Sequence, residues 1–216
     1  FKELIDALID VDCRIRLGSL EVNVITEEFL SSLKKLKDFA PHFHLSLQSG
    51  STAVLKTMNR RYTAEEFLNK CELIRKFFPS AALTTDIIVG YSTETEENFQ
   101  ETLDTARKAA FADIHCFPYS KREGTAGAKL KEIPYAVKAE RTDRLLKLKA
   151  ELKEAFIKKN LGEIHELIPE ETTDGYLVGY TENYIRCYVK SDFINKKIKI
   201  RLTKPFRDGA LAELAE

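Results

Sequence analysis

Polar side chains that could hold a ligand gather where apolar segments of the chain end. Residues 42–51 (HFHLSLQSGS) show this best, because apolar and polar residues alternate through Leu47 and predict a short strand. Gln48 and Ser49 follow with an amide and a hydroxyl suited to hydrogen-bonding a ligand, and Gly50 permits a sharp exit from the strand. The sequence therefore predicts a binding site at the C-terminal end of this strand, with turn chemistry alone as the alternative.

Further polar positions follow three other segments with strand patterns. These segments are residues 13–17, 81–90 and 111–117, and the positions at or after their ends are Ser19, Glu21, Gly90, Glu94, Pro118, Tyr119 and Ser120. Helical patterns occur at residues 2–9, 26–36, 63–74 and 93–106. Alternating strands and helices predict an α/β fold with a parallel sheet, open or curled into a TIM-like (βα) barrel, whose site lies at the strand C-termini. Four strands are too few to close a barrel, so we expect further strands upstream of Phe1.

Asp86 is an acid inside an otherwise apolar predicted strand. Burying it unpaired would cost several kcal/mol, so we expect a partner, either a backbone amide or arginine, or a bound ligand. The histidines show no ligand spacing and are interpreted as core or surface residues: His42, His44, His115 and His165. The cysteines lie far apart without a Cys-x-x-Cys pair, which favours reduced, mostly buried thiols and predicts no metal site in this chain: Cys13, Cys71, Cys116 and Cys187.

The chain changes character after a long helical pattern that runs from Pro134 to about Asn160. Five short strand patterns follow at residues 163–168, 175–179, 184–189, 197–202 and 210–214, which predicts a small antiparallel β-barrel. We therefore expect two domains, residues 1–161 and 162–216.

Charge is balanced over the whole chain, with 34 Lys and Arg against 34 Asp and Glu, so any nucleic-acid site must be local. Residues 186–207 are strongly basic and interleaved with aromatic residues, a pattern that suits phosphates and stacked bases of single-stranded RNA. The candidate RNA contacts are Tyr184, Arg186, Tyr188, Lys196, Lys197, Lys199 and Arg201. A solvated barrel face is the alternative. No apolar run reaches the roughly 20 residues of a membrane span, and a cytoplasmic location is expected.

Five motifs resemble, in order and spacing, those of the radical S-adenosylmethionine methylthiotransferases. They are Arg16-Leu-Gly-Ser-Leu-Glu21, His44-Leu-Ser-Leu-Gln-Ser-Gly-Ser51, Met58-Asn-Arg-Arg-Tyr-Thr63, Thr85-Asp-Ile-Ile-Val-Gly90 and Phe117-Pro-Tyr-Ser-Lys-Arg-Glu-Gly-Thr125. The C-terminal segment resembles the family's TRAM domain, an RNA-binding, OB-like β-barrel. The first and last motifs are most similar to the branch that modifies threonylcarbamoyl-adenosine beside the tRNA anticodon.

The resemblance implies a reaction, cofactors and contacts. In the family, a 4Fe-4S cluster cleaves S-adenosylmethionine to a 5′-deoxyadenosyl radical, which activates C2 of an adenosine for methylthio insertion. The implied S-adenosylmethionine contacts are Ser19, Glu21, Gln48, Ser49, Arg60, Asp86, Gly90 and Tyr119. Among them, Glu21 would accept from the ammonium group, while Arg60, or else Arg61, would hold the carboxylate.

The sequence also departs from the family. It lacks the Cys-x-x-x-Cys-x-x-Cys loop that holds the cluster and the N-terminal domain that holds a second one, and Ser92-Thr93 stands where the family has Pro-Gly. We therefore expect this chain alone to be inactive. Alternative functions are a non-catalytic RNA-binding module or a methylthiotransferase that acts on a ribosomal protein. We also expect residues 13–17 to form an exposed sheet edge, which favours edge-strand or swapped homodimers.

Overall fold

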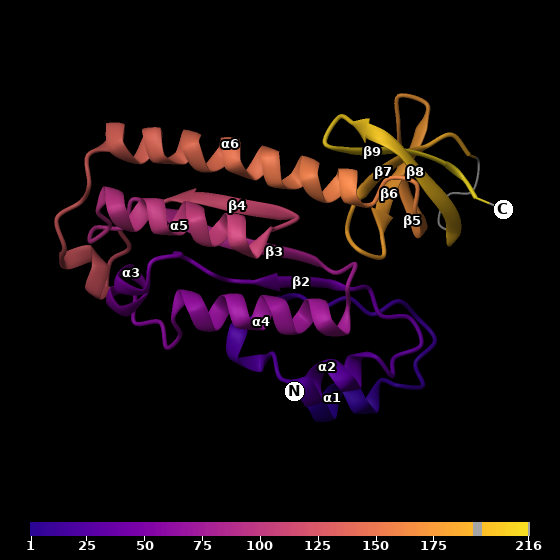
Figure 1. Ribbon diagram of the computed structural model, residues 1–216, viewed down its shortest axis with the longest axis horizontal. Helices are drawn as coiled ribbons and strands as arrows, with labels where there is room; N and C mark the ends of the chain where they lie inside the picture. The colour runs from indigo at the N-terminus through magenta and orange to yellow at the C-terminus, as the bar shows by residue number, and fades with distance from the viewer. Residues whose placement is uncertain (192–195, 216) are drawn as a thin grey trace.

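The computed structural model describes residues 1–191 and 196–215, which form a parallel sheet covered by helices and a small closed barrel (Figure 1). The sheet has the strand order β1-β2-β3-β4, with parallel pairing throughout. Its strands are β1 Ser19–Leu20, β2 His42–Leu45, β3 Ala82–Val89 and β4 Asp113–Pro118. The helical elements are α1 Lys2–Ala7, η1 Val22–Val24, α2 Glu27–Leu33, α3 Thr52–Thr57, α4 Ala64–Phe77, α5 Glu96–Ala109, η2 Ala126–Lys129 and α6 Tyr135–Lys159. The prediction of a partial parallel (βα) barrel is confirmed.

Local sequence explains where the main helices begin. Thr63 caps α4 by accepting the Glu66 N–H at 3.1 Å, and the Glu66 carboxylate accepts the Thr63 N–H at 2.7 Å. Thr95 and Asn98 repeat this reciprocal capping box at α5. Each box satisfies backbone N–H groups that have no partner inside the helix, and it fixes the residue at which the helix begins.

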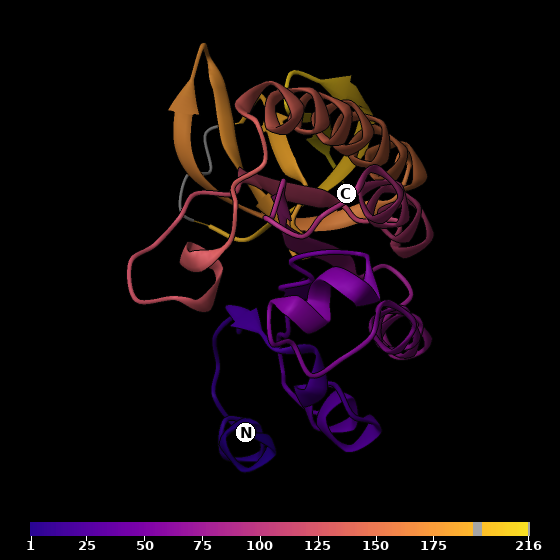
Figure 2. The same cartoon turned by 90° about the vertical axis from the view of Figure 1, so that its left-hand side faces the viewer.

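Alternate residues of the sheet strands face opposite sides. The helix-facing side is apolar and shares one buried cluster with α2, α4 and α5; its members include Phe43, Leu45, Leu83, Ile87 and Ile114. In Figure 2, α4, α5 and α6 lie together on one side of the sheet, and the segment that carries η2 lies on the other side. The side opposite the helices is polar and carries His42, His44, Thr84, Asp86 and His115.

One detail of the predicted sheet is wrong. Residues 13–17 do not form a strand: Ile15 alone bridges to Phe39, and the first strand is Ser19–Leu20. The ladder stops after Ile15, because the His42 N–H that its next step would use donates to the Ala40 carbonyl instead, at 2.7 Å. Every residue of β2 is buried. The alternation of apolar and polar residues in this strand therefore distinguishes an apolar face from a polar face that is buried as well. The edge strand of the sheet is the two-residue strand β1, in place of the predicted residues 13–17. Homodimerisation through this edge stays a prediction.

The C-terminal barrel closes in the order β5-β6-β7-β9-β8 around Leu167, Cys187, Val189, Ile200 and Leu202. Its strands are β5 Ile164–Thr173, β6 Tyr176–Thr181, β7 Arg186–Val189, β8 Ile198–Phe206 and β9 Gly209–Leu214. The predicted small barrel is confirmed, with one correction. It is not fully antiparallel, because β7 and β9 pair in parallel. A closed ring of five strands cannot alternate direction at every step, so at least one pairing must be parallel.

Polar contacts join the small barrel to the sheet. Arg14 forms ion pairs with Asp38 at 3.1 Å and with Glu166 of β5 at 2.6 Å. Lys197 reaches Asp38 at 2.7 Å, so this carboxylate is shared by two cations from opposite sides of the junction. Burial alone would raise the pKa of Asp38, but hydrogen bonds from Lys197 and Arg14 outweigh burial and lower it. Asp38 therefore stays ionised and holds the two parts together.

Gly50 allows the turn after β2 to approach α5 closely. A Cβ at this position would lie 2.6 Å from the Thr102 Cα and 2.7 Å from the Thr105 Cβ. We expect Gly50→Ala to lower the free energy of unfolding by about 1–3 kcal/mol, because backbone and helix must separate. Urea denaturation measures this, with Gly18→Ala as the matched control, since no atom lies within 4 Å of the added carbon there. Equal stability of the two variants would contradict the prediction.

Candidate functional site

An open cavity of about 660 Å³ lies where β2, β3 and β4 end, as parallel-sheet topology predicts. The polar residues Gln48, Arg60, Asp86 and Tyr119 line it, and Ile88, Tyr91 and Phe117 add apolar and aromatic surface. Gly127 of η2 lines the opposite side. Four of the eight residues predicted to contact the cofactor therefore meet at one cavity.

The backbone conformation of Gln48 itself sets the direction in which the chain leaves β2. Its φ of 66° lies in the left-handed region, which a non-glycine residue adopts only where the surroundings enforce it. Its N–H donates to the Asp86 carbonyl and its own carbonyl accepts from the Ile88 N–H, each at 2.8 Å. The sharp change of direction that we predicted at Gly50 thus occurs at Gln48, which also lines the cavity.

The two adjacent arginines of the Met58–Thr63 motif have different positions. Arg60 lines the cavity, and its guanidinium lies 3.8 Å from the carboxylate of Glu21, whose side chain is 73% exposed. Arg61 is exposed and is not among the residues that line the cavity. The structure thus separates the alternatives that the sequence left open and places Arg60, with Glu21 beside it, at the site.

Three other predicted contacts do not line the cavity. Ser49 is completely buried, and its Oγ lies 3.2 Å from the Thr102 Oγ1. Gly90 is buried with a φ of 73°, and its N–H donates to the Glu94 carboxylate at 2.7 Å. Ser19 is an exposed residue of the edge strand β1. Ser49 and Gly90 therefore shape the turns that carry Gln48 and Tyr91, and do not face the cavity themselves.

A buried ion pair holds the turn after β3. Arg141 of α6 donates to the Glu94 carboxylate at 2.9 Å and to the Glu94 carbonyl at 3.1 Å, and their side chains are 5% and 1% exposed. Burial raises the pKa of Glu94 above its usual value, while the Gly90 N–H and Arg141 oppose the rise. The Glu94 N–H closes the turn on the Tyr91 carbonyl at 2.8 Å. The turn is therefore formed although Ser92-Thr93 replaces Pro-Gly.

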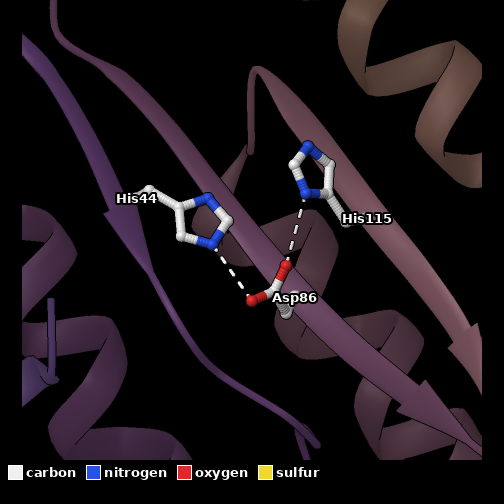
Figure 3. Close-up of side chains that lie close together, drawn as sticks. All are labelled: His44, Asp86 and His115. Atoms are coloured by element: carbon white, nitrogen blue, oxygen red, sulfur yellow. Dashed lines mark hydrogen bonds and ion pairs between the residues drawn. The ribbon is translucent and has the colours of Figure 1, made fainter. Parts of the chain in front are cut away.

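Asp86 has partners that the sequence did not predict. Its carboxylate lies 3.1 Å from the His44 Nε2 and 3.3 Å from the His115 Nδ1 (Figure 3). The Ser46 hydroxyl lies 3.4 Å from the same carboxylate. His44 is buried and His115 is half exposed, in line with their interpretation as core and surface residues, and parallel pairing brings both to the same carboxylate. The sequence feature that could have predicted this cluster is the alternation of apolar and polar residues, because His44, Asp86 and His115 each occupy the polar face of their own strand.

The cysteines do not fit a 4Fe-4S cluster. They lie on separate elements, with Cys71 in α4, Cys116 in β4 and Cys187 in the small barrel, and only Cys13 is exposed. Burial raises the pKa of Cys71 to about 12 and that of Cys116 to about 11, which disfavours the thiolate that iron requires. The prediction of free, mostly buried thiols agrees with these positions.

The predicted RNA contacts divide into anchored and surface residues. Tyr188 is 3% exposed and donates to the Asp208 carboxylate, so its ring cannot stack on a base in this conformation. Tyr184 stacks on His42 of β2 with ring centroids 3.9 Å apart. Arg186 is held by Glu171 at 2.7 Å and Asp208 at 2.8 Å.

The remaining predicted contacts are exposed: Lys196, Lys197, Lys199 and Arg201. Lys197 already pairs with Asp38, and the Arg201 guanidinium donates to the Gly162 carbonyl at 2.6 Å. The barrel therefore offers a basic surface around β8, while Tyr184 and Tyr188 pack against other side chains. Within the described part of the chain, no helix is both long enough and apolar enough to cross a membrane.

Comparisons with known proteins agree with the motifs. Residues 1–106 match the model of the Radical SAM superfamily. The chain is 37% identical over 214 residues to the Bacillus subtilis threonylcarbamoyladenosine tRNA methylthiotransferase MtaB, covering 94% of this chain and 48% of that protein. It is 37% identical over 213 residues to the tRNA-2-methylthio-N(6)-dimethylallyladenosine synthase of Caldicellulosiruptor saccharolyticus, covering 93% and 44%.

A solved structure shares the fold. The Escherichia coli coproporphyrinogen III oxidase HemN, described as a radical SAM enzyme, superposes with a TM-score of 0.58 at 16% identity, over 95% of this chain and 52% of that one. The chain spans about half the length of the curated relatives that it matches. The family match and the identity over nearly the whole chain show that this protein belongs to the radical SAM superfamily, in the methylthiotransferase family that its motifs resemble.

Proposed function

We propose that this chain forms one wall of the S-adenosylmethionine site and the RNA-binding barrel of a tRNA methylthiotransferase. The proposed reaction inserts a methylthio group at C2 of a modified adenosine next to the anticodon, of the threonylcarbamoyl type. The supporting observation is the cavity at the strand ends, where Gln48, Arg60, Asp86 and Tyr119 meet in a chain that is homologous to such enzymes.

The cavity fits S-adenosylmethionine chemically. Arg60 can hold the carboxylate with two hydrogen bonds, and Glu21 beside it can accept from the ammonium group. The Gln48 amide can donate to or accept from the ribose hydroxyls. Phe117, which is half exposed, and the paired rings of Tyr91 and Tyr119, 4.9 Å apart, give apolar surface for the adenine. When bound and reduced, the cofactor supplies a 5′-deoxyadenosyl radical; the residues of this chain bind and orient it.

A calorimetric titration with S-adenosylmethionine tests this assignment. We expect Arg60→Ala to weaken binding about 10-fold or more, because a charge-assisted bidentate contact contributes about 1.5–3 kcal/mol. Arg61→Ala is the matched control. It removes the same charge at the next residue, whose side chain lies outside the cavity. Equal affinity of the two variants would contradict the role of Arg60. Binding of RNA without any binding of the cofactor would instead favour a non-catalytic RNA-binding module.

We further propose that the isolated chain holds no 4Fe-4S cluster and catalyses no insertion, since its cysteines lie apart and are mostly buried. After reconstitution with iron and sulfide, we expect neither the broad visible absorption nor the paramagnetic signal of a reduced cluster. A stable, stoichiometric cluster in the 216-residue chain would overturn this part of the proposal.

A further inference from the structure

His44, Asp86 and His115 gather three metal-binding groups on the polar face of the sheet (Figure 3). They come from the neighbouring parallel strands β2, β3 and β4, and Asp86 lies directly opposite His115 in the register. One nitrogen from each histidine and an oxygen of Asp86 all lie within 4.8 Å of one another. Regular strand pairing sets these positions, so the cluster belongs to the rigid part of the fold.

The separations suit ligands of one ion. The carboxylate lies 3.1 Å from the His44 Nε2 and 3.3 Å from the His115 Nδ1. Two ligands at a tetrahedral angle, each about 2.1 Å from a metal, lie roughly 3.4 Å apart. Two imidazoles and one carboxylate form a donor set that binds divalent transition metals while leaving coordination positions open.

A second layer of contacts orients His44. The His44 Nδ1 lies 2.9 Å from the Thr84 Oγ1, and this hydroxyl lies 2.8 Å from the His42 Nε2. Metal-bound histidines usually fix their second nitrogen by such a contact. With an ion on the His44 Nε2, the Nδ1–H would donate to the Thr84 hydroxyl. Because the Arg16 guanidinium donates to the His42 Nδ1, the His42 Nε2–H donates to the same hydroxyl. The chain of hydrogen bonds needed to support a bound histidine is thus already present.

The cluster also opens on one side. The side chains of His44 and Asp86 are 11% and 24% exposed, whereas that of His115 is 53% exposed. Of the three residues, Asp86 lines the 660 Å³ cavity and His115 lines a separate hollow of about 140 Å³. An ion at the cluster could therefore reach a water molecule or a ligand oxygen of the cavity on its Asp86 side.

We propose that the His44 Nε2, the Asp86 carboxylate and the His115 Nδ1 bind one divalent transition-metal ion whose open positions face the cavity. The donor set contains nitrogen and oxygen only, so this site differs in kind from a thiolate-held iron–sulfur cluster. Such an ion would hold an oxygen atom of water or substrate at the floor of the cavity.

Isothermal titration of the chelator-treated 216-residue chain with Zn²⁺ alone tests the site. We expect one equivalent to bind, and His115→Ala or Asp86→Asn to weaken binding roughly 100-fold, since even changes beyond the direct ligands cost 10–100-fold. His115→Ala is the safer variant because its side chain is half exposed. Cys13→Ser, which removes the one exposed thiol, is the control and should leave binding unchanged.

Two further measurements keep the outcomes distinct. Zn²⁺ should raise the melting temperature of the unaltered chain but not that of His115→Ala, because binding to the native state alone stabilises it. Co²⁺ should give visible bands without the intense near-ultraviolet charge transfer of thiolate ligation. Absence of binding, or binding that survives both ligand variants in folded protein, would overturn the proposal and leave a hydrogen-bonded cluster without an ion.

Discussion

Arg141→Ala is expected to lower the free energy of unfolding by about 3–5 kcal/mol, because it leaves the buried Glu94 carboxylate without its charge partner. Both side chains are nearly inaccessible, and Arg141 donates to the carboxylate and the carbonyl of Glu94. Water cannot replace these contacts without opening the junction between α6 and the turn after β3. Urea denaturation followed by circular dichroism measures the loss.

Arg144→Ala supplies the matched control for this prediction. Arg144 is one turn further along α6 and pairs with Glu96, as Arg141 also does, but its side chain is 33% exposed. We expect a cost of about 0–1 kcal/mol, as for other surface pairs. Similar losses from the two substitutions would show that the buried pair contributes no more than a surface pair.

The loss caused by Arg141→Ala should also depend on pH. Burial already raises the pKa of Glu94, and removal of Arg141 raises it further. A carboxyl group with a raised native pKa costs stability above its unfolded pKa of about 4.3, and the cost grows until the pH passes the native pKa. The deficit should therefore be larger at pH 8 than at pH 5, and an equal deficit at both would contradict the assignment to an unpaired carboxylate.

Reversing two charges on the small barrel should weaken RNA binding about 10-fold or more at physiological salt. Lys196 and Lys199 are exposed beside and within β8, whereas Tyr188 is buried and Tyr184 is stacked on His42. Binding must then depend chiefly on phosphate contacts, which release counterions. In a gel-shift titration with a tRNA anticodon stem-loop, Lys196→Glu/Lys199→Glu should also reduce the slope of log K against log salt by about 1.4.

Lys76→Glu/Lys108→Glu is the charge-matched control, because it changes the net charge equally at exposed positions on α4 and α5. We expect this variant to bind RNA nearly as tightly as the unaltered chain. If both double variants lose affinity equally, the effect comes from net charge, and the basic barrel surface is not the RNA site.

Local sequence patterns were enough to predict the order of the strands and helices, because hydrophobic period and capping residues are local properties. Thr63 with Glu66 begins α4, and the apolar run before Gly90 forms a strand that is buried on most of both faces. Strand ends in a parallel sheet share one edge, so Gln48 and Tyr119 could be predicted to meet.

The tertiary structure alone decided which polar groups face the cavity and which are paired. Ser49 and Gln48 are neighbours in sequence, yet Ser49 is buried against α5 and Gln48 lines the cavity. The reason is the left-handed backbone of Gln48, which changes the direction of the chain at this point. The meeting of His44, Asp86 and His115 depends on strand register across 71 residues of sequence from His44 to His115, which no local spacing encodes. Burial of Tyr188 likewise depends on closure of the barrel. An alternating strand pattern alone does not determine whether the side of the strand that carries Tyr188 becomes buried.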